Sequence, residues 1–240
     1  FKDNEYKTAG AKILSNEKEI LETADVIVQL GLLSDDKKDL LKENQIYIGV
    51  LNPYDNKEKI DKLVKNKINI FSLELLPRIT RAQSMDILSS QANLAGYKAV
   101  VDSFAEFKRA IPMMMTAAGT ISAAKVLVIG AGVAGLQAIA TAKRMGAIVF
   151  ATDVRMTSKE QVESLGGKFL VVEGSENLET EGGYAKEASE EFKKKQEELL
   201  SETLKKIDIV ICTALMPGKK APLIIKDEMI MNMKSGSVIY

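Results

Sequence analysis

A glycine-rich run, Gly130-Ala131-Gly132-Val133-Ala134-Gly135, has the spacing G-x-G-x-x-G. It follows the apolar run Val126–Ile129 and opens a helical pattern, and the next apolar run ends in Asp153, about 20 residues further on. In this arrangement a tight turn brings backbone amides to a pyrophosphate, and the acid accepts hydrogen bonds from a ribose. The alternative is a glycine-rich turn in an unrelated α/β domain. The combination of strand, helix and acid favours dinucleotide binding.

The residues after the second strand bear on which dinucleotide is bound. Asp153 would repel a 2′-phosphate, which favours NAD over NADP. Arg155, two positions later, could instead accept such a phosphate. The acid at the strand end is the stronger signal, so we predict NAD(H).

A second polar segment, Pro77–Asn93, is dense in small and polar residues and follows the apolar run Ile68–Leu75. Loops after the carboxyl ends of parallel strands line ligand crevices, so a functional loop is one interpretation. The other is an ordinary helix start with capping residues and a surface Arg–Asp pair. The residues alone leave both open.

Composition narrows the chemistry. The 240 residues contain 33 basic and 33 acidic side chains, so no overall field attracts nucleic acid. Histidine is absent, which excludes histidine-dependent catalysis, and with a single cysteine it argues against a metal site. Cys212 stands in an apolar run, so we expect a buried thiol in a reducing compartment. No stretch is apolar for long enough to span a membrane.

Strands and helices are expected to alternate along the chain. Expected strands are 24–30, 45–51, 68–75, 125–129, 147–152, 168–172, 207–213 and one starting at 237; expected helices are 35–44, 57–66, one or two within 83–109, 135–145, 158–165 and 184–206. This order predicts an α/β protein of two Rossmann-like, doubly wound parallel-sheet domains with a nucleotide cleft between them. We expect the domains at 1–115 and 116–240. A start at Phe1 without Met, and an end within an apolar run, suggest a piece of a longer polypeptide, truncated before the first domain and lacking C-terminal helices.

Several runs resemble one family. The segments are 77–97, Pro112–Thr120, Gly130–Ala140, Ala151–Arg155, Glu160–Gly166, Gly182–Glu187, Thr213–Gly218 and Gly236–Ile239. Together they are similar to the NAD(H)-binding component of proton-translocating nicotinamide nucleotide transhydrogenases, in the alanine dehydrogenase/transhydrogenase family. The resemblance covers nearly the whole chain from about Asp25 onward.

The resemblance implies roles for individual residues. Arg78, Gln83, Asp86 and Ser89 would surround the nicotinamide ring, with Ile79 and Thr80 also contacting the cofactor. Gly130, Ala131, Gly132, Val133 and Gly135 would hold the pyrophosphate, and Asp153, Val154 and Arg155 the adenosine ribose. Gly183 and Tyr184 would belong to a mobile loop that closes over the nucleotide, and Ala214 and Leu215 would lie on the adenine side.

The resemblance also implies an activity. Hydride would pass directly between NAD(H) on this component and NADP(H) on a partner component, coupled in the full complex to proton translocation. Such a protein would be a homodimer and a soluble peripheral domain at the cytoplasmic face of the inner membrane. It would bind neither nucleic acid nor metal.

Two other functions are alternatives to the transhydrogenase reaction. An alanine-dehydrogenase-like enzyme would use a histidine and a lysine, but Gly49 stands where that histidine is expected and Gln29-Leu30-Gly31 where the lysine is expected. A non-catalytic NAD-sensing module is the other.

Overall fold

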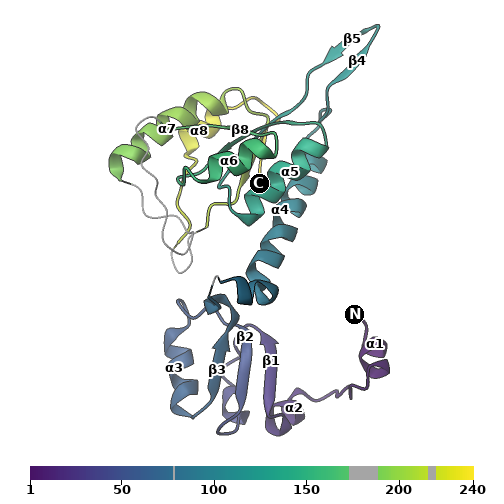
Figure 1. The fold of residues 1–240 in the computed structure, drawn as a ribbon, viewed down its shortest axis with the longest axis vertical. Coiled ribbons are helices and arrows are strands. Elements are labelled where there is room, and N and C mark those ends of the chain that lie inside the picture. Colours follow the sequence, from purple (N-terminus) through teal and green to yellow (C-terminus); the bar gives the residue numbers. More distant parts are fainter. Residues whose placement is uncertain (78, 173–188, 216–219) are drawn as a thin grey trace. The chain divides into compact units, whose positions relative to one another are not determined.

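The chain forms two compact units, Phe1–Ile87 and Leu88–Tyr240 (Figure 1). The computed structural model describes residues 1–77, 79–172, 189–215 and 220–240. The division lies before the boundary at 115/116 that the sequence suggests for the functional domains, and that assignment stays a prediction. Within the described residues, no helix combines the length and apolarity needed to cross a bilayer.

Unit 1 is an α/β unit built on a parallel sheet. Its elements are α1 (Asp3–Thr8), α2 (Glu17–Thr23), β1 (Val26–Leu30), β2 (Ile46–Val50), α3 (Lys57–Lys65), β3 (Asn69–Ser72) and the 3-10 helices η1 (Lys38–Leu40), η2 (Leu73–Leu75) and η3 (Thr80–Met85). The strand order is β1-β2-β3, and both pairings are parallel. The expected strands are therefore confirmed, with shorter bounds.

One face of this sheet carries the core of unit 1. Leu21 of α2 and Leu63 of α3 pack there with Ile27 and Tyr47 from the strands. Side chains alternate across a strand, so their neighbours point to the other face. On that face Val28 and Leu30 of β1 are exposed, at 74% and 83%.

The helix expected at 35–44 is wrong. Only Lys38–Leu40 is helical there, as the 3-10 helix η1. Lys38 is buried and pairs with Asp35, and Asn44 has a left-handed φ of 67° with its N–H donating to the carbonyl of Lys67. These contacts hold the segment in a chain of turns, which the sequence pattern did not predict.

Unit 2 contains the longer sheet. Its elements are α4 (Ile87–Glu106), β4 (Met114–Thr116), β5 (Gly119–Ile121), β6 (Lys125–Ile129), α5 (Val133–Arg144), β7 (Ile148–Thr152), α6 (Ser158–Ser164), β8 (Lys168–Phe169), α7 (Glu190–Leu204), β9 (Ile209–Cys212), α8 (Asp227–Met231) and β10 (Val238–Ile239). The five-stranded sheet has the order β10-β9-β6-β7-β8, and all its pairings are parallel. Numbered within the sheet, this is the order 5-4-1-2-3, which matches the first five strands of the nucleotide-binding Rossmann order 3-2-1-4-5-6.

Two cores cover the two faces of this sheet. On one face, Val126 and Val128 of β6 pack with residues of α4, α5 and α6, among them Val100, Ile139 and Val162. On the other face, Leu127 and Ile129 pack with residues of α7 and α8. The doubly wound arrangement expected from the sequence is confirmed in this unit.

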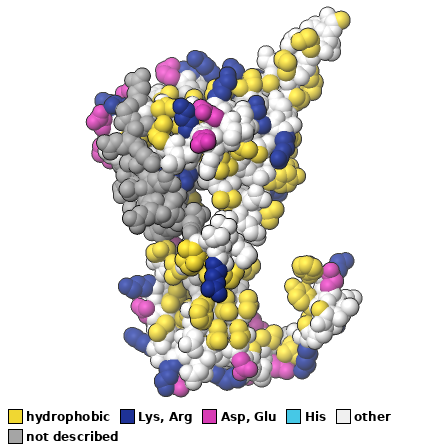
Figure 2. Space-filling model, in the orientation of Figure 1, with side chains coloured by type: hydrophobic (Ala, Val, Ile, Leu, Met, Phe, Trp, Pro, Cys, Tyr) yellow, Lys and Arg dark blue, Asp and Glu magenta, His cyan; other side chains and the backbone are white. Residues whose placement is uncertain are grey.

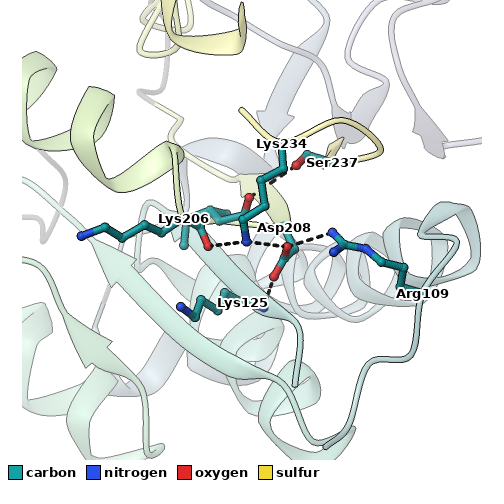
Figure 3. Close-up of polar contacts among 7 residues, drawn as sticks. Arg109, Lys125, Lys206, Asp208, Lys234 and Ser237 are labelled. Carbon is teal, nitrogen blue, oxygen red and sulfur yellow. Dashed lines mark hydrogen bonds and ion pairs between the residues drawn. The ribbon is translucent and has the colours of Figure 1, made fainter. Parts of the chain in front are cut away.

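A buried carboxylate ties together the edge of the sheet at which the strands begin. Asp208, just before β9, accepts hydrogen bonds from the backbone N–H of Lys125, the guanidinium of Arg109 and the ammonium of Lys234, each at 2.9 Å (Figure 3). Burial alone would raise the pKa of Asp208, but these donors and charges lower it. The network joins the segment after α4 to the starts of β6 and β9 and to the turn before β10.

Two features of unit 2 differ from expectation. The strands β4 and β5 form an antiparallel hairpin that the sequence pattern did not predict. Its side chains are exposed, including Met114 and Met115, as is Met113 directly before β4, and hydrophobic side chains gather along the hairpin in Figure 2. Cys212, expected to be buried, is exposed at the end of β9.

Candidate nucleotide-binding site

The glycine-rich run lies where parallel sheets bind ligands. It connects the end of β6 to the start of α5, and β6 is the strand at which the order reverses, with β7 on one side and β9 on the other. In open α/β sheets, ligands bind outside the carboxyl ends of the strands at such a switch point. The strand, turn and helix predicted around the motif are therefore confirmed.

The three glycines of the motif differ in what a side chain would meet. Gly130 has φ +93°, and a Cβ there would lie 2.9 Å from the backbone nitrogen of Ala214. At Gly135 a Cβ would lie 1.8 Å from the carbonyl oxygen of Gly130. At Gly132 it would meet nothing within 4 Å. Gly130 and Gly135 are thus required by the protein itself, while Gly132 faces open space of the kind that a pyrophosphate needs at a helix N-terminus.

Thr213 fixes the turn and was not among the predicted site residues. Its hydroxyl donates to the carbonyl of Gly130 at 2.7 Å and contacts that of Ile129 at 3.2 Å. Its backbone N–H also donates to Ile129 O at 2.8 Å. No local sequence pattern marks Thr213, because it follows β9 and only the strand order, with β9 next to β6, brings its hydroxyl to the turn.

Asp153 is joined to both the turn and Arg155. Its Oδ2 accepts from the N–H of Ala131 at 2.6 Å and from Arg155 Nη2 at 2.9 Å. Its Oδ1 accepts from the N–H and the Nε of Arg155, at 2.8 and 2.9 Å. The two side chains are 7% and 16% exposed. The structure therefore brings together Ala131, Asp153, Val154 and Arg155 at the ends of β6 and β7.

The residues predicted for the adenine side follow the end of β9. Ala214 is half-buried beside Gly130, and Leu215 is 73% exposed. Val133, which starts α5, is exposed. The predicted loop residues Gly183 and Tyr184 lie outside the described residues.

The residues predicted for the nicotinamide side follow β3 and η2 along the chain. Ile79, Thr80 and Gln83 are exposed in and beside η3, and Asp86 follows it. Ser89 lies in α4, which belongs to unit 2. Asp86 and Ser89 both have interaction partners. Arg78 lies outside the described residues, and the gathering of this group around one ring stays a prediction.

Helix α4 is fixed directly on α5. A Cβ at Gly96 of α4 would lie 2.1 Å from the carbonyl oxygen of Ala134, inside the glycine-rich run. Only a glycine permits this approach between the two helices. The element that carries Ser89 is therefore packed against α5, the helix that begins within the glycine-rich run.

Two family models match the chain, one after the other. Residues 1–95 match the alanine dehydrogenase/PNT N-terminal domain, and residues 99–240 match the C-terminal domain of the same family.

Individual relatives agree with these matches. The chain is 55% identical over 244 residues to an NAD(P) transhydrogenase alpha-subunit polypeptide of Rhodospirillum rubrum, covering 99% of this chain and 64% of the relative. A solved transhydrogenase from Sinorhizobium meliloti superposes with a TM-score of 0.84 at 48% identity, covering 100% of this chain and 64% of that one. An L-alanine dehydrogenase structure has a TM-score of 0.75 at 19% identity over 100% of this chain and 61% of its own, a likeness of fold alone.

The chain spans 64% of the length of the first two of these proteins. Both domain models match in order, and the Rossmann order of unit 2 agrees with them. The chain therefore belongs to the alanine dehydrogenase/PNT family.

Proposed function

We propose that the chain is the NAD(H)-binding part of an NAD(P) transhydrogenase, which exchanges hydride directly with NADP(H) held by a partner component. The observation that carries the proposal is the turn at the switch point of unit 2, where Gly132 leaves open space and Asp153 lies beside the turn. The names of the similar proteins supply the reaction class.

The residues form two groups in this proposal. The NAD(H)-binding domain, 116–240, holds pyrophosphate and adenosine through Gly130, Ala131, Gly132, Val133, Gly135, Asp153, Val154, Ala214 and Leu215, and Arg155 lies beside Asp153 at the place of the adenosine ribose. The domain 1–115 supplies the nicotinamide side through Arg78, Ile79, Thr80, Gln83, Asp86 and Ser89. Gly183 and Tyr184 belong to the loop that closes over the nucleotide.

The composition of the chain suits this reaction. The bound nucleotides supply the hydride chemistry, and direct transfer needs no separate acid or base. What the protein has to provide is orientation and the exclusion of water. A sequence with no histidine can provide both.

The sheet of unit 1 argues against an alanine-dehydrogenase mechanism. Gly49 pairs with Gln29 across β1 and β2, and a Cβ at Gly49 would lie 2.0 Å from the carbonyl oxygen of Gln29. A histidine at this position would require β1 to move. The position where that enzyme would need its histidine therefore excludes a side chain here.

The wider assembly is included in the proposal. The partner carries NADP(H), and a membrane component couples hydride transfer to proton translocation. The NAD(H)-binding component would sit peripherally at the cytoplasmic face of the inner membrane as a homodimer. The exposed apolar side chains of the β4–β5 hairpin favour association, and sedimentation of the wild type beside a Met114→Ser, Met115→Ser variant would test the dimer.

The experiment compares nucleotides and partners. Full-length protein is titrated with NADH and NADPH, then mixed with NADH and an oxidised NADP analogue, with and without a transhydrogenase NADP(H)-binding component. We expect preference for NADH and turnover only with the partner. NADH oxidation by pyruvate and ammonia would favour the alanine dehydrogenase reaction, and binding without turnover in any mixture would favour an NAD-sensing module.

A further inference from the structure

The carboxylate of Asp153 already has a full set of hydrogen-bond donors. Each of its two oxygens accepts two hydrogen bonds, from the N–H groups of Ala131 and Arg155 and from Nε and Nη2 of Arg155. A carboxylate offers about four acceptor positions. The two hydroxyls of an adenosine ribose would therefore find none open.

The four donors differ in how readily they can leave. The N–H of Ala131 belongs to the turn after β6 and that of Arg155 to the chain after β7, so both are fixed by the backbone. The guanidinium is at the end of a long, rotatable side chain. Its two hydrogen bonds to Asp153, one to each carboxylate oxygen, are the ones that a ligand can replace.

We propose that Arg155 is an internal stand-in for the adenosine ribose. It occupies Asp153 in the empty site and is displaced when NAD(H) binds, so that two ribose hydroxyls replace two guanidinium N–H groups. The inference rests on the proposed function and adds to it a mechanism for nucleotide choice.

Charge repulsion alone does not account for that choice in this structure. The bidentate pair of Asp153 and Arg155 is neutral overall, so a 2′-phosphate meets little net negative charge. A ribose that carries the 2′-phosphate has, however, lost its 2′-hydroxyl, which is one of the two donors needed to replace the guanidinium. Discrimination then comes from the number of hydroxyl donors, and the displacement lowers the affinity for NAD(H) as well.

The test removes the stand-in and keeps the acceptor. Arg155→Met, which has no donor, should bind NADH about tenfold more tightly than the wild type in calorimetric titration, because two acceptor positions are open in advance. The affinity for AMP should rise by a similar factor, and the affinity for 2′-deoxy-AMP, which has one hydroxyl fewer, should rise less. Arg144→Met, at an exposed arginine of α5, is the matched control and should bind as the wild type does.

A second background checks that the effect acts through the carboxylate. In Asp153→Ala protein, adding Arg155→Met should give no further gain. Should the methionine variant fail to fold, Arg155→Lys retains the charge but loses the bidentate geometry, and should show a smaller gain in NADH affinity.

The outcomes separate this inference from the proposed function. Unchanged or weaker NADH binding in the folded Arg155 variants, with the wild type still preferring NADH to NADPH, would overturn the stand-in role alone. Equal gains for AMP and 2′-deoxy-AMP would also overturn it. A wild type that fails to bind NADH, or prefers NADPH, would overturn both proposals.

Discussion

The glycines of the turn allow a sharp test, because the same substitution to alanine should affect nucleotide binding at one of them and folding at another. Gly132→Ala places a methyl group in open space, and Gly135→Ala places one 1.8 Å from the carbonyl oxygen of Gly130. The first should impair nucleotide binding with little effect on folding. The second should impair folding itself.

The expected magnitudes follow from the local geometry. Gly132 is the N-cap of α5 with φ −77°, which alanine adopts without strain. Replacing a glycine N-cap with alanine lowers the free energy of unfolding by a few tenths to about 1 kcal/mol. Alanine also restricts the unfolded chain, which raises the free energy of unfolding by about 0.4–1 kcal/mol, so the net change should be near zero. At Gly135 the start of α5 has to move away from the turn, which we expect to cost about 3 kcal/mol. For a unit of this size that corresponds to a midpoint lowered by about 6–12 °C.

Two measurements on each variant suffice. Thermal unfolding followed by circular dichroism reports the folding effect, and NADH titration at a temperature where both variants are folded reports binding. We expect Gly132→Ala to weaken NADH by about tenfold or more, which is about 1.4 kcal/mol, because its methyl group would occupy the space of the pyrophosphate.

Either of two results would refute this reasoning. A Gly132→Ala protein that binds NADH as the wild type does would mean that the pyrophosphate lies elsewhere. Equal stability of the wild type and Gly135→Ala would mean that the close approach of α5 to the turn is not required.

Three further predictions concern folding. Asp208→Asn should destabilise unit 2 by about 2 kcal/mol in urea unfolding, a value discounted because its two cationic partners are 53% and 40% exposed. Since the folded pKa of Asp208 lies below 3.8, its contribution should be complete above about pH 4 and be lost as pH falls through the folded value, and the variant should lack that acid-dependent loss. Thr213→Val should lower stability by about 1 kcal/mol and weaken NADH binding, since the Gly130 carbonyl loses its donor; unchanged melting and binding would contradict this. Gly49→Ala should destabilise unit 1 by about 3 kcal/mol, because its methyl group would meet the Gln29 carbonyl, and an unaltered melting curve would count against the strand geometry.

The sequence predicted the buried sheet of unit 2 well. Lys125–Ile129 is a strand with the expected bounds, because four consecutive buried positions leave a continuous apolar run. The β4–β5 hairpin was missed because its strands have three residues each and are exposed on both faces, so neither burial nor alternation marks them. The helix expected at 35–44 was wrong because the turns of this segment depend on the Lys38–Asp35 contact and on the left-handed conformation of Asn44.

For the candidate site, the motif predicted the turn but not its contacts. The spacing of Gly130 and Asp153 was enough to locate the strand ends, since backbone conformation restricts residue type there. The sequence could not predict that Arg155 occupies acceptor positions of the Asp153 carboxylate, because either side chain could have faced the ligand. Thr213 was missed as a site residue because its contact spans 83 residues of sequence, and only the strand order brings it to the turn.

The methionines of the hairpin have a chemical consequence. Met113, Met114 and Met115 are exposed at 61%, 46% and 71%, so peroxide can reach their thioethers. Oxidation to sulfoxide makes each side chain polar and chiral, and methionine sulfoxide reductases reverse it. The hairpin thus carries its own footprinting probe: any surface that covers it should slow sulfoxide formation at these three positions, which peptide mass spectrometry can follow without a label.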